Sequence, residues 1–212
     1  MSAETKLAPL VLIVSGPSGS GKSTLVQRIL ELPGTMPSVS CTTRPRRATE
    51  ASGKCYAYLT EAEFDAMVAR GEFLEYARVF GKHSYGTPKK WLEESRKKSL
   101  DLVLEIDVQG AAQVKEKLPE SIAIFILPPS RAELERRLRS RGQDSREEIA
   151  RRLAKARDEI AAFGRYYDYC VVNDNVERAG REAQSIVIAI RCSAARRRPR
   201  VEELLASFGG KD

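Results

Sequence analysis

The chain has 212 residues, of which 42% are hydrophobic, so we expect one domain of ordinary size with a substantial buried core. No apolar run approaches the roughly 20 residues that are needed to cross a bilayer, and residues 1–9 lack the hydrophobic centre of a secretion signal. These features argue against a membrane protein. The formal net charge of +7 suits a phosphate-rich ligand and a nucleic acid equally well.

The cysteine and histidine content narrows the chemistry further. The cysteines are far apart and none has the C-x-x-C spacing of a zinc site; they are Cys41, Cys55, Cys170 and Cys192. This spacing favours reduced thiols in a cytoplasmic protein over bound zinc. The single histidine, His83, argues against a metal site or a catalytic triad that is centred on histidine.

The first predicted elements are a core strand, a helix and a segment of different character. Leu10–Val14 is predicted to be a buried central strand because it is short, continuous and rich in branched residues. The following helix is predicted from Ser23 to about Leu32. From Ser38 to Lys90 the chain has short runs rich in Thr, Arg, Tyr and Gly, which indicate an inserted, mostly-β region. Its one predicted helix begins at the capping box Thr60–Glu63 and ends at Gly71.

The second half of the chain alternates strands with helices. The predicted strands are Leu102–Ile106, Ile122–Leu127 and Tyr169–Val172, and the predicted helices are Val108–Lys117, 130–140, 145–163 and Val176–Arg191. In the helix that follows Ser145, apolar residues at helical spacing form one stripe: Ile149, Leu153, Ala156, Ile160 and Phe163. This alternation predicts an α/β fold, in which a parallel sheet carries helices on both faces.

A glycine-rich stretch, Gly16–Ser23, lies between the first strand and the first helix. Its sequence GPSGSGKS has the spacing of a P-loop in the context that a P-loop requires. Glycines allow successive backbone N–H groups to turn inward as an anion site, and the positive end of the following helix faces the same hollow. The stretch therefore predicts a nucleoside triphosphate site.

Two side chains of this stretch have expected roles of their own. Lys22 reaches the β- and γ-phosphates, and the Ser23 hydroxyl binds Mg²⁺ directly. A glycine turn with a lysine nearby by coincidence is the alternative, and it leaves most of the pattern unexplained. The residues expected to bind the triphosphate are Gly16, Pro17, Ser18, Gly19, Ser20, Gly21, Lys22, Ser23 and Thr24.

A P-loop identifies the phosphoryl donor, so the acceptor has to come from the insert. There Arg44, Arg46 and Arg47 stand beside several hydroxyl side chains, without an acidic neighbour until Glu50. Guanidinium groups match phosphate oxygens in pairs. Charge alone nevertheless favours a solvated basic loop.

The sequence from Ser38 to Arg44, SVSCTTR, followed by Arg47 and Tyr56, resembles the signature of the guanylate kinase family. Further matching segments are Phe73–Glu75, Tyr85–Thr87, Leu104–Gly110, Leu127–Ser130, 141–142 and Val172–Asp174. The resemblance runs from about Leu10 to about Ile190, in order and with the family's spacings. It departs from the family at Pro45 and Thr49 and by one added residue just before Tyr85.

The resemblance implies a three-layer P-loop fold with three parts. They are a core of residues 1–38, 91–128 and 165–212, a GMP-binding insert of residues 39–90 and a helical lid of residues 129–164. It implies Mg²⁺-assisted transfer of a phosphoryl group from ATP to GMP, with dGMP as a further acceptor. We expect the insert and the lid to close on the substrates as rigid bodies.

The resemblance also assigns site residues by position. It implies that GMP is bound by Ser38, Arg44, Arg47, Tyr56, Glu75, Tyr85, Gly86, Thr87 and Asp107. It implies that Asn173 contacts adenine and that Glu105, in place of the family's aspartate, holds the metal through water. The residues expected to promote phosphoryl transfer are Lys22, Arg44, Arg137, Arg141 and Arg152.

Elementary chemistry agrees with these assignments. Guanine presents two adjacent hydrogen-bond donors, and the single carboxylate of Glu75 can accept from both. Adenine would leave that carboxylate unpaired. Such pairing can discriminate between the two bases by a factor of about 10⁴. The second phosphate pKa of GMP lies near 6, so the acceptor is largely dianionic at neutral pH and needs no strong base. Lys22, Mg²⁺ and the lid arginines then serve by positioning and by charge.

Three other functions are consistent with parts of the sequence. Guanylate-kinase-like binding modules of membrane scaffolds share the fold, but they typically lose the working P-loop that this chain keeps. Another small-metabolite kinase is disfavoured by Glu75 together with Tyr85–Thr87. Nucleic-acid binding is suggested by Arg191 and by 196–200, although a solvated helix end explains these arginines as well. Self-association is neither required nor excluded by the residues.

Overall fold

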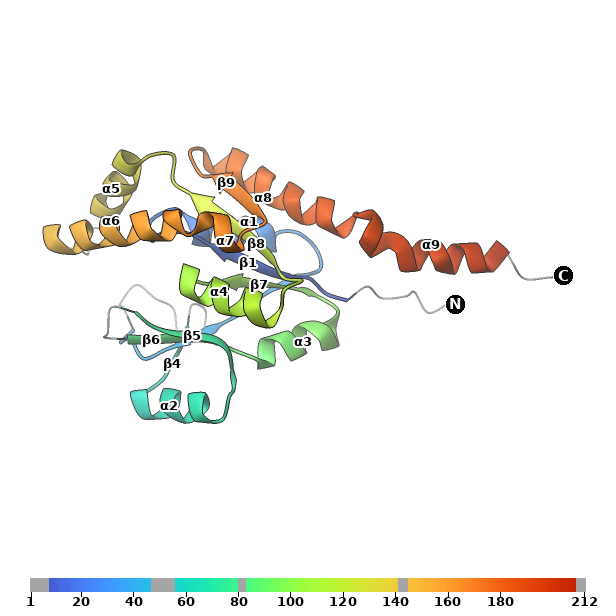
Figure 1. Ribbon diagram of the computed structural model, residues 1–212, viewed down its shortest axis with the longest axis horizontal. Helices are drawn as coiled ribbons and strands as arrows, with labels where there is room; N and C mark the ends of the chain where they lie inside the picture. Colours follow the sequence, from blue (N-terminus) through green and yellow to red (C-terminus); the bar gives the residue numbers. More distant parts are fainter. Residues whose placement is uncertain (1–7, 47–55, 80–82, 141–144, 209–212) are drawn as a thin grey trace.

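The computed structural model describes residues 8–46, 56–79, 83–140 and 145–208. A five-stranded parallel sheet forms the centre of the molecule, in the order β2-β7-β1-β8-β9 (Figure 1). Its strands are β1 (Val11–Ser15), β2 (Thr35–Pro37), β7 (Asp101–Glu105), β8 (Ile122–Leu127) and β9 (Tyr169–Val172). The parallel α/β fold that the alternation of elements predicts is therefore confirmed.

The sheet is covered on both faces because successive side chains of a strand point to opposite sides. On one face Leu12 and Val14 pack against helices α1 (Lys22–Leu30) and α8 (Val176–Arg191). On the other face Ile13 packs with residues of α4 (Val108–Lys117), and Trp91 of α3 (Lys90–Lys98) borders the same cluster. The continuous apolar runs of the central strands follow from this two-sided burial.

The insert forms a second, four-stranded sheet in the order β4-β3-β6-β5. Its strands are β3 (Ser40–Thr42), β4 (Tyr56–Tyr58), β5 (Phe73–Val79) and β6 (His83–Pro88). Helix α2 (Glu61–Ala69) begins at the predicted capping box, in which the Thr60 hydroxyl accepts from the Glu63 N–H at 3.2 Å. Phe64 of α2 stacks on Phe73 of β5 at 4.6 Å and closes a small core.

The region between β8 and β9 is helical. It contains α5 (Arg131–Ser140), α6 (Arg146–Ala161) and the short α7 (Phe163–Tyr166). The predicted stripe is wrong at its last member: α6 ends at Ala161, and Phe163 lies in α7. There it faces the rings of Phe125 and Tyr167, at 5.5 and 6.0 Å, instead of the neighbouring helix α5.

The last described element is α9 (Ala194–Phe208), which follows α8 closely and extends away from the sheet (Figure 1). The reading of 196–200 as a solvated helix end agrees with the structure, in which these residues lie in the first turns of α9 and all but Arg196 are exposed. Within the described ranges, no helix combines the length and the apolar character that a membrane span requires.

Candidate functional site

The P-loop backbone has a conformation that only glycine adopts readily. Gly16, Gly19 and Gly21 have φ angles of +141°, +93° and +92°. A Cβ at Gly16 would lie 2.4 Å from the carbonyl oxygen of Ile126 on the neighbouring strand. The loop is therefore folded tightly against β8, with Pro17, Gly19 and Ser20 buried and Ser18 exposed.

Lys22 begins helix α1 and folds back over this loop. Its Nζ donates to the carbonyl oxygens of Gly16, at 2.7 Å, and Pro17, at 3.1 Å. Because both acceptors are neutral, a phosphate at the loop would be a stronger partner for the ammonium group. The lysine is thus held where the expected triphosphate would lie.

Ser23 and Glu105 meet at the carboxyl end of β7. The exposed Ser23 hydroxyl donates to Oε1 of Glu105 at 2.6 Å, and Thr24, next on α1, is also exposed. A hydroxyl and a carboxylate at this distance form the hard oxygen donor set that suits Mg²⁺. Both residues were expected from the sequence at a magnesium site, Ser23 directly and Glu105 through water, and the structure brings their side chains together.

Two lid arginines lie against the P-loop. Arg137 of α5 donates to the carbonyl oxygens of Ser20, at 3.3 Å, and Asn173, at 2.8 Å. Arg152 of α6 donates to Oγ of Ser18 at 3.2 Å. The third expected lid arginine, Arg141, lies outside the described residues.

Asn173 follows β9 and is 2% exposed. Its side-chain amide donates to the Ser20 carbonyl at 2.8 Å, whereas its Oδ1 is buried without a hydrogen-bond partner among the described residues. A buried acceptor of this kind costs free energy unless a ligand or water supplies a donor. The adenine contact expected at Asn173 would provide one.

Replacing Gly21 with alanine is expected to destabilise the protein by about 2–4 kcal/mol. The new Cβ would lie 2.1 Å from Nδ2 of Asn173, at a φ angle of +92°, so the amide must move and lose its bond to Ser20. Urea unfolding checks this, with Gly164→Ala as the matched control because a Cβ there meets nothing within 4 Å. Equal midpoints for the two variants would contradict the close approach.

A buried carboxylate lies in the insert. Glu75 of β5 is 4% exposed, and its Oε1 accepts from the Thr87 hydroxyl of β6 at 2.6 Å. The Ser40 hydroxyl is 3.2 Å from Thr87 Oγ1; since Thr87 donates to Glu75, Ser40 donates to Thr87. Burial raises the pKa of the Glu75 carboxyl from its ordinary 4.5 to about 7, and the charge of Asp107 adds to this shift.

Asp107 joins this carboxylate to the core. It caps α4, where its Oδ1 accepts from the Gly110 N–H at 3.0 Å, while its Oδ2 is buried without a hydrogen bond to a described residue. A Cβ at Gly110 would lie 2.6 Å from Oε2 of Glu75, so the helix start and the insert meet closely at this glycine. The carboxylates of Glu75 and Asp107 therefore lie near each other, and Asp107 Oδ2 remains available to a ligand that presents several donors.

The other residues expected to bind the acceptor include an aromatic and basic group on the second sheet. Arg44 donates from Nε to the Tyr85 hydroxyl at 3.1 Å, and its guanidinium carbon is 5.7 Å from the centre of the Tyr56 ring. Gly86 has no room for a side chain, because a Cβ would be 2.8 Å from Phe73 Cδ1. Ser38 is half-buried just after β2, and Arg47 lies outside the described residues.

Sequence reasoning missed the contacts that hold the insert to the core. The Gln113 side chain of α4 pairs with the backbone of Tyr76 through two hydrogen bonds, of 2.7 and 3.2 Å. Lys117 donates to the carbonyl of Leu74 at 2.6 Å. These bonds flank Glu75 on strand β5, so α4 fixes the position of the buried carboxylate. The only sign of these contacts in the sequence was that polar residues of α4 recur every three or four positions. That spacing is also common on solvated helices.

The lid contributes a second missed pair, Lys155 and Glu159 of α6. Lys155 Nζ is 3.6 Å from Oδ2 of Asp107 and 3.4 Å from Oε1 of Glu159. Burial raises the pKa of Glu159, against the opposing charges of Lys155 and Lys22. Helix α6, in the region expected to form the lid, thus contacts both the P-loop and Asp107.

The comparisons with known proteins agree on one family. A family model described as guanylate kinase matches residues 8–189. The chain is 46% identical to a guanylate kinase of Myxococcus xanthus, with 99% of this chain and 100% of the relative covered. It is also 46% identical to one of Vibrio parahaemolyticus, with coverages of 92% and 96%. The crystal structure of guanylate kinase from Anaplasma phagocytophilum is similar with a TM-score of 0.74, at 34% identity over 90% of each chain.

Proposed function

The chain belongs to the guanylate kinase family, and we propose on this premise that it transfers the γ-phosphoryl group of ATP to GMP, giving ADP and GDP. The observation that carries the proposal is the buried carboxylate of Glu75, which lies in one site with an intact P-loop. The P-loop accounts for a nucleoside triphosphate as donor. The carboxylate accounts for an acceptor that presents adjacent N–H groups, as guanine does.

The donor half of the site would be formed by the P-loop and its neighbours. The phosphates would occupy the loop, and Lys22 would exchange the carbonyls of Gly16 and Pro17 for phosphate oxygens. Ser23 would bind Mg²⁺ directly and Glu105 through water. Mg²⁺ held by these two residues would supply positive charge that offsets the charge of the phosphates. Asn173 would accept from the adenine amino group through its unpaired Oδ1.

The acceptor half would be formed by the insert. Glu75 and Asp107 would accept from the guanine edge, and Thr87 would keep Glu75 oriented. The phosphate of GMP would be bound by Arg44 and the tyrosine hydroxyl groups of Tyr56 and Tyr85, together with Ser38 and Arg47. An Arg–Tyr pair at 3.1 Å is already arranged for such a phosphate.

Transfer then needs position and charge rather than a strong base. The GMP phosphate is largely dianionic at neutral pH and attacks directly, in line with the leaving ADP oxygen. Arg137 and Arg152, which lie against Ser20 and Ser18, would turn their guanidinium groups to the transferring phosphoryl group. We propose that residues 39–90 and 129–164 close around both nucleotides, so that water is excluded.

An acceptor panel tests this function. ADP release is followed with GMP, AMP, CMP, UMP and a sugar phosphate, each with ATP and with or without Mg²⁺. We expect Mg²⁺-dependent turnover with GMP and little with AMP. Turnover with a different acceptor would indicate another small-metabolite kinase, and binding of GMP without turnover would indicate a non-catalytic binding module.

The affinity for GMP is expected to fall as the pH decreases below 7. A carboxyl group with a pKa of about 7 is neutral at lower pH, and the neutral form cannot accept from both guanine donors. The apparent Kd should therefore rise about tenfold from pH 8 to pH 6. Calorimetric titration measures it, and Glu75→Gln is the control, since it should keep only the titration of the GMP phosphate near pH 6. The same pH profile in both proteins would contradict a role for Glu75.

A further inference from the structure

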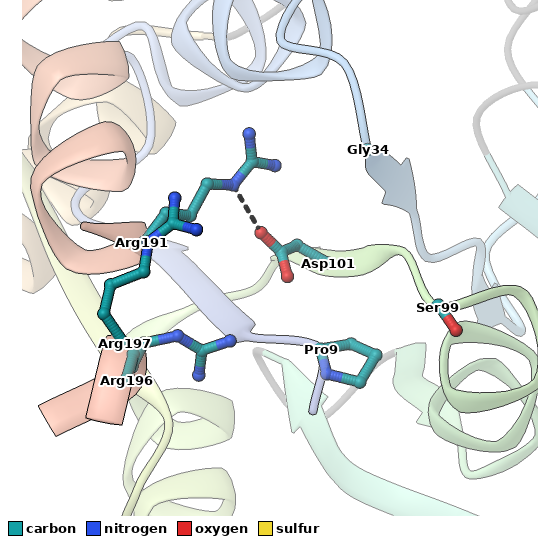
Figure 2. A pocket seen from close by; sticks show the side chains of 7 residues that line it. All are labelled: Pro9, Gly34, Ser99, Asp101, Arg191, Arg196 and Arg197. Carbon is teal, nitrogen blue, oxygen red and sulfur yellow. Dashed lines mark hydrogen bonds and ion pairs between the residues drawn. The ribbon is translucent and has the colours of Figure 1, made fainter. Parts of the chain in front are cut away.

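A pocket at the opposite edge of the sheet is not used by the proposed reaction. It has a volume of about 240 Å³ and is lined by Pro9, Gly34, Ser99, Asp101, Arg191, Arg196 and Arg197 (Figure 2). Pro9, Gly34 and Asp101 lie at the amino ends of strands β1, β2 and β7. The P-loop follows the carboxyl end of β1, so the sheet separates this pocket from the nucleotide site.

The pocket contains more positive than negative charge. Both oxygens of its carboxylate, Asp101, already have hydrogen-bond partners. Oδ1 accepts from the Leu10 N–H at 2.7 Å, and Oδ2 accepts from Arg191 Nε at 2.8 Å. This ion pair balances Arg191 only. The charges of Arg196 and Arg197 are left without a counter-charge among the residues that line the pocket.

One hydrogen-bond donor of Arg196 is also unsatisfied. Nε of Arg196 is buried and has no acceptor among the described residues, although its Nη2 donates to the carbonyl of Ala8 at 2.6 Å. For the Arg197 guanidinium, the described ranges offer only Cys192 Sγ, at 4.0 Å. A buried guanidinium N–H without an acceptor is costly, so an anion that accepts from it would be bound favourably.

The position of these arginines in helix α9 adds to the imbalance. Arg196 and Arg197 lie in the first turn, Arg198 and Arg200 follow, and the first turn has no acidic residue. Cations at the amino end of a helix are repelled by its dipole. A bound anion would compensate both the dipole and the side chains.

We propose that this pocket binds a small multivalent oxyanion of the diphosphate type. Arg196 would turn its buried Nε toward the anion, while Arg191 and Arg197 would donate from their terminal nitrogens. Figure 2 shows Arg191 directed at Asp101 and Arg196 directed toward Pro9, with Arg197 beside them. Three arginines that line one small pocket suit a compact anion better than the repeated backbone of a duplex, which the arginine run alone had suggested.

Titration of the full chain with sodium pyrophosphate tests the proposal. The test variant is Arg196→Gln with Arg197→Gln. The matched control is Arg198→Gln with Arg200→Gln, which removes the same charge from exposed positions of the same helix, outside the pocket. We expect two binding events in the wild type and in the control, one at the untouched P-loop. In the test variant the second event should be lost or weakened at least tenfold.

Two further arms make the result specific. Arg197→Gln alone should weaken the second event without affecting folding, because that side chain is exposed and its one described contact is long. A titration with GDP distinguishes the source of the diphosphate: an effect of the test variant on both ligands indicates a nucleotide, and an effect on pyrophosphate alone indicates the free anion. GMP phosphorylation without added anion should be unchanged in the test variant, so failure of this proposal and of the proposed function are distinguishable.

Several outcomes would overturn the proposal. One is equal pyrophosphate binding by the test variant and the wild type. Another is an equal loss in the control, which would indicate general surface charge. A third is steeply salt-dependent binding of duplex nucleic acid that depends on all four arginines and is not displaced by pyrophosphate.

Discussion

Lys22→Ala is expected to lower the turnover of ATP with GMP by a factor of about 10³ or more. The lysine ammonium is held at the P-loop by the carbonyls of Gly16 and Pro17, and in the proposed reaction it moves to the phosphates. Alanine removes the one positive side chain of the loop and keeps a good helix-forming residue at the start of α1. Steady-state ADP release measures the effect.

Lys98→Ala is the matched control for this experiment. Lys98 is exposed at the end of α3 and pairs only with Glu94 among the described residues, at 2.9 Å. Its removal should change turnover by less than a factor of two, and circular dichroism should show that both variants are folded. If Lys22→Ala retained more than about a tenth of the wild-type activity, the P-loop lysine would not have the proposed role.

Glu75→Gln is expected to lower kcat/KM for GMP by a factor of about 10²–10⁴. The carboxylate has two acceptor oxygens for the two guanine donors, whereas the amide has one acceptor and would direct an N–H group at a second donor. The affinity for ATP should be unchanged, because Glu75 lies in the insert and not in the P-loop. Kinetics with GMP and AMP at fixed ATP measure the change in base preference.

The same substitution should stabilise the unliganded protein at pH 8. In the folded state the pKa of Glu75 is raised to about 7 by burial, so between pH 4.5 and 7 the folded chain holds a proton that the unfolded chain has lost. Stability from this group is therefore lost as the pH rises through that window, up to about 3 kcal/mol. Glutamine removes this loss, and its advantage should disappear at pH 4.

Glu72→Gln provides the matched control for both measurements. It makes the same chemical change three residues earlier, where the side chain is exposed and pairs with Arg70. Neither GMP preference nor the pH dependence of stability should change appreciably. A loss of GMP preference in both variants would mean that charge on the insert, and not the carboxylate of Glu75, determines base selection.

Short-range patterns predicted much of this structure correctly. The P-loop spacing gave the strained glycines at Gly16 and Gly21, and the capping box gave the start of α2 at Thr60. Both features are determined by residues that are close together in the chain, so they can be predicted from the sequence. The resemblance to a family then identified Glu75 as a candidate site residue. Without that resemblance, its acidic side chain between apolar neighbours would have indicated an exposed position, whereas it is buried.

The elements and contacts that were missed depend on distant parts of the chain. Strand β2 has only three residues and includes Pro37, so it is recognisable only through its pairing with β7. Helix α3 is largely polar and lacks a clear apolar stripe, although Trp91 anchors it through a bond to the carbonyl of Val39 at 2.9 Å. The pairing of Lys155 with Asp107 joins two helices that no local pattern connects.

The turn after β7 has a consequence for how the two nucleotides are aligned. Glu105 meets Ser23 in the proposed donor half of the site, and Asp107 lies near the Glu75 carboxylate in the proposed acceptor half. Only two peptide bonds separate the two residues, so the backbone limits the distance between their Cα atoms to about 7 Å. The short turn after β7 would therefore limit the distance between the proposed metal site and the proposed purine site. Domain closure would bring the two substrates to these sites without changing the distance between them.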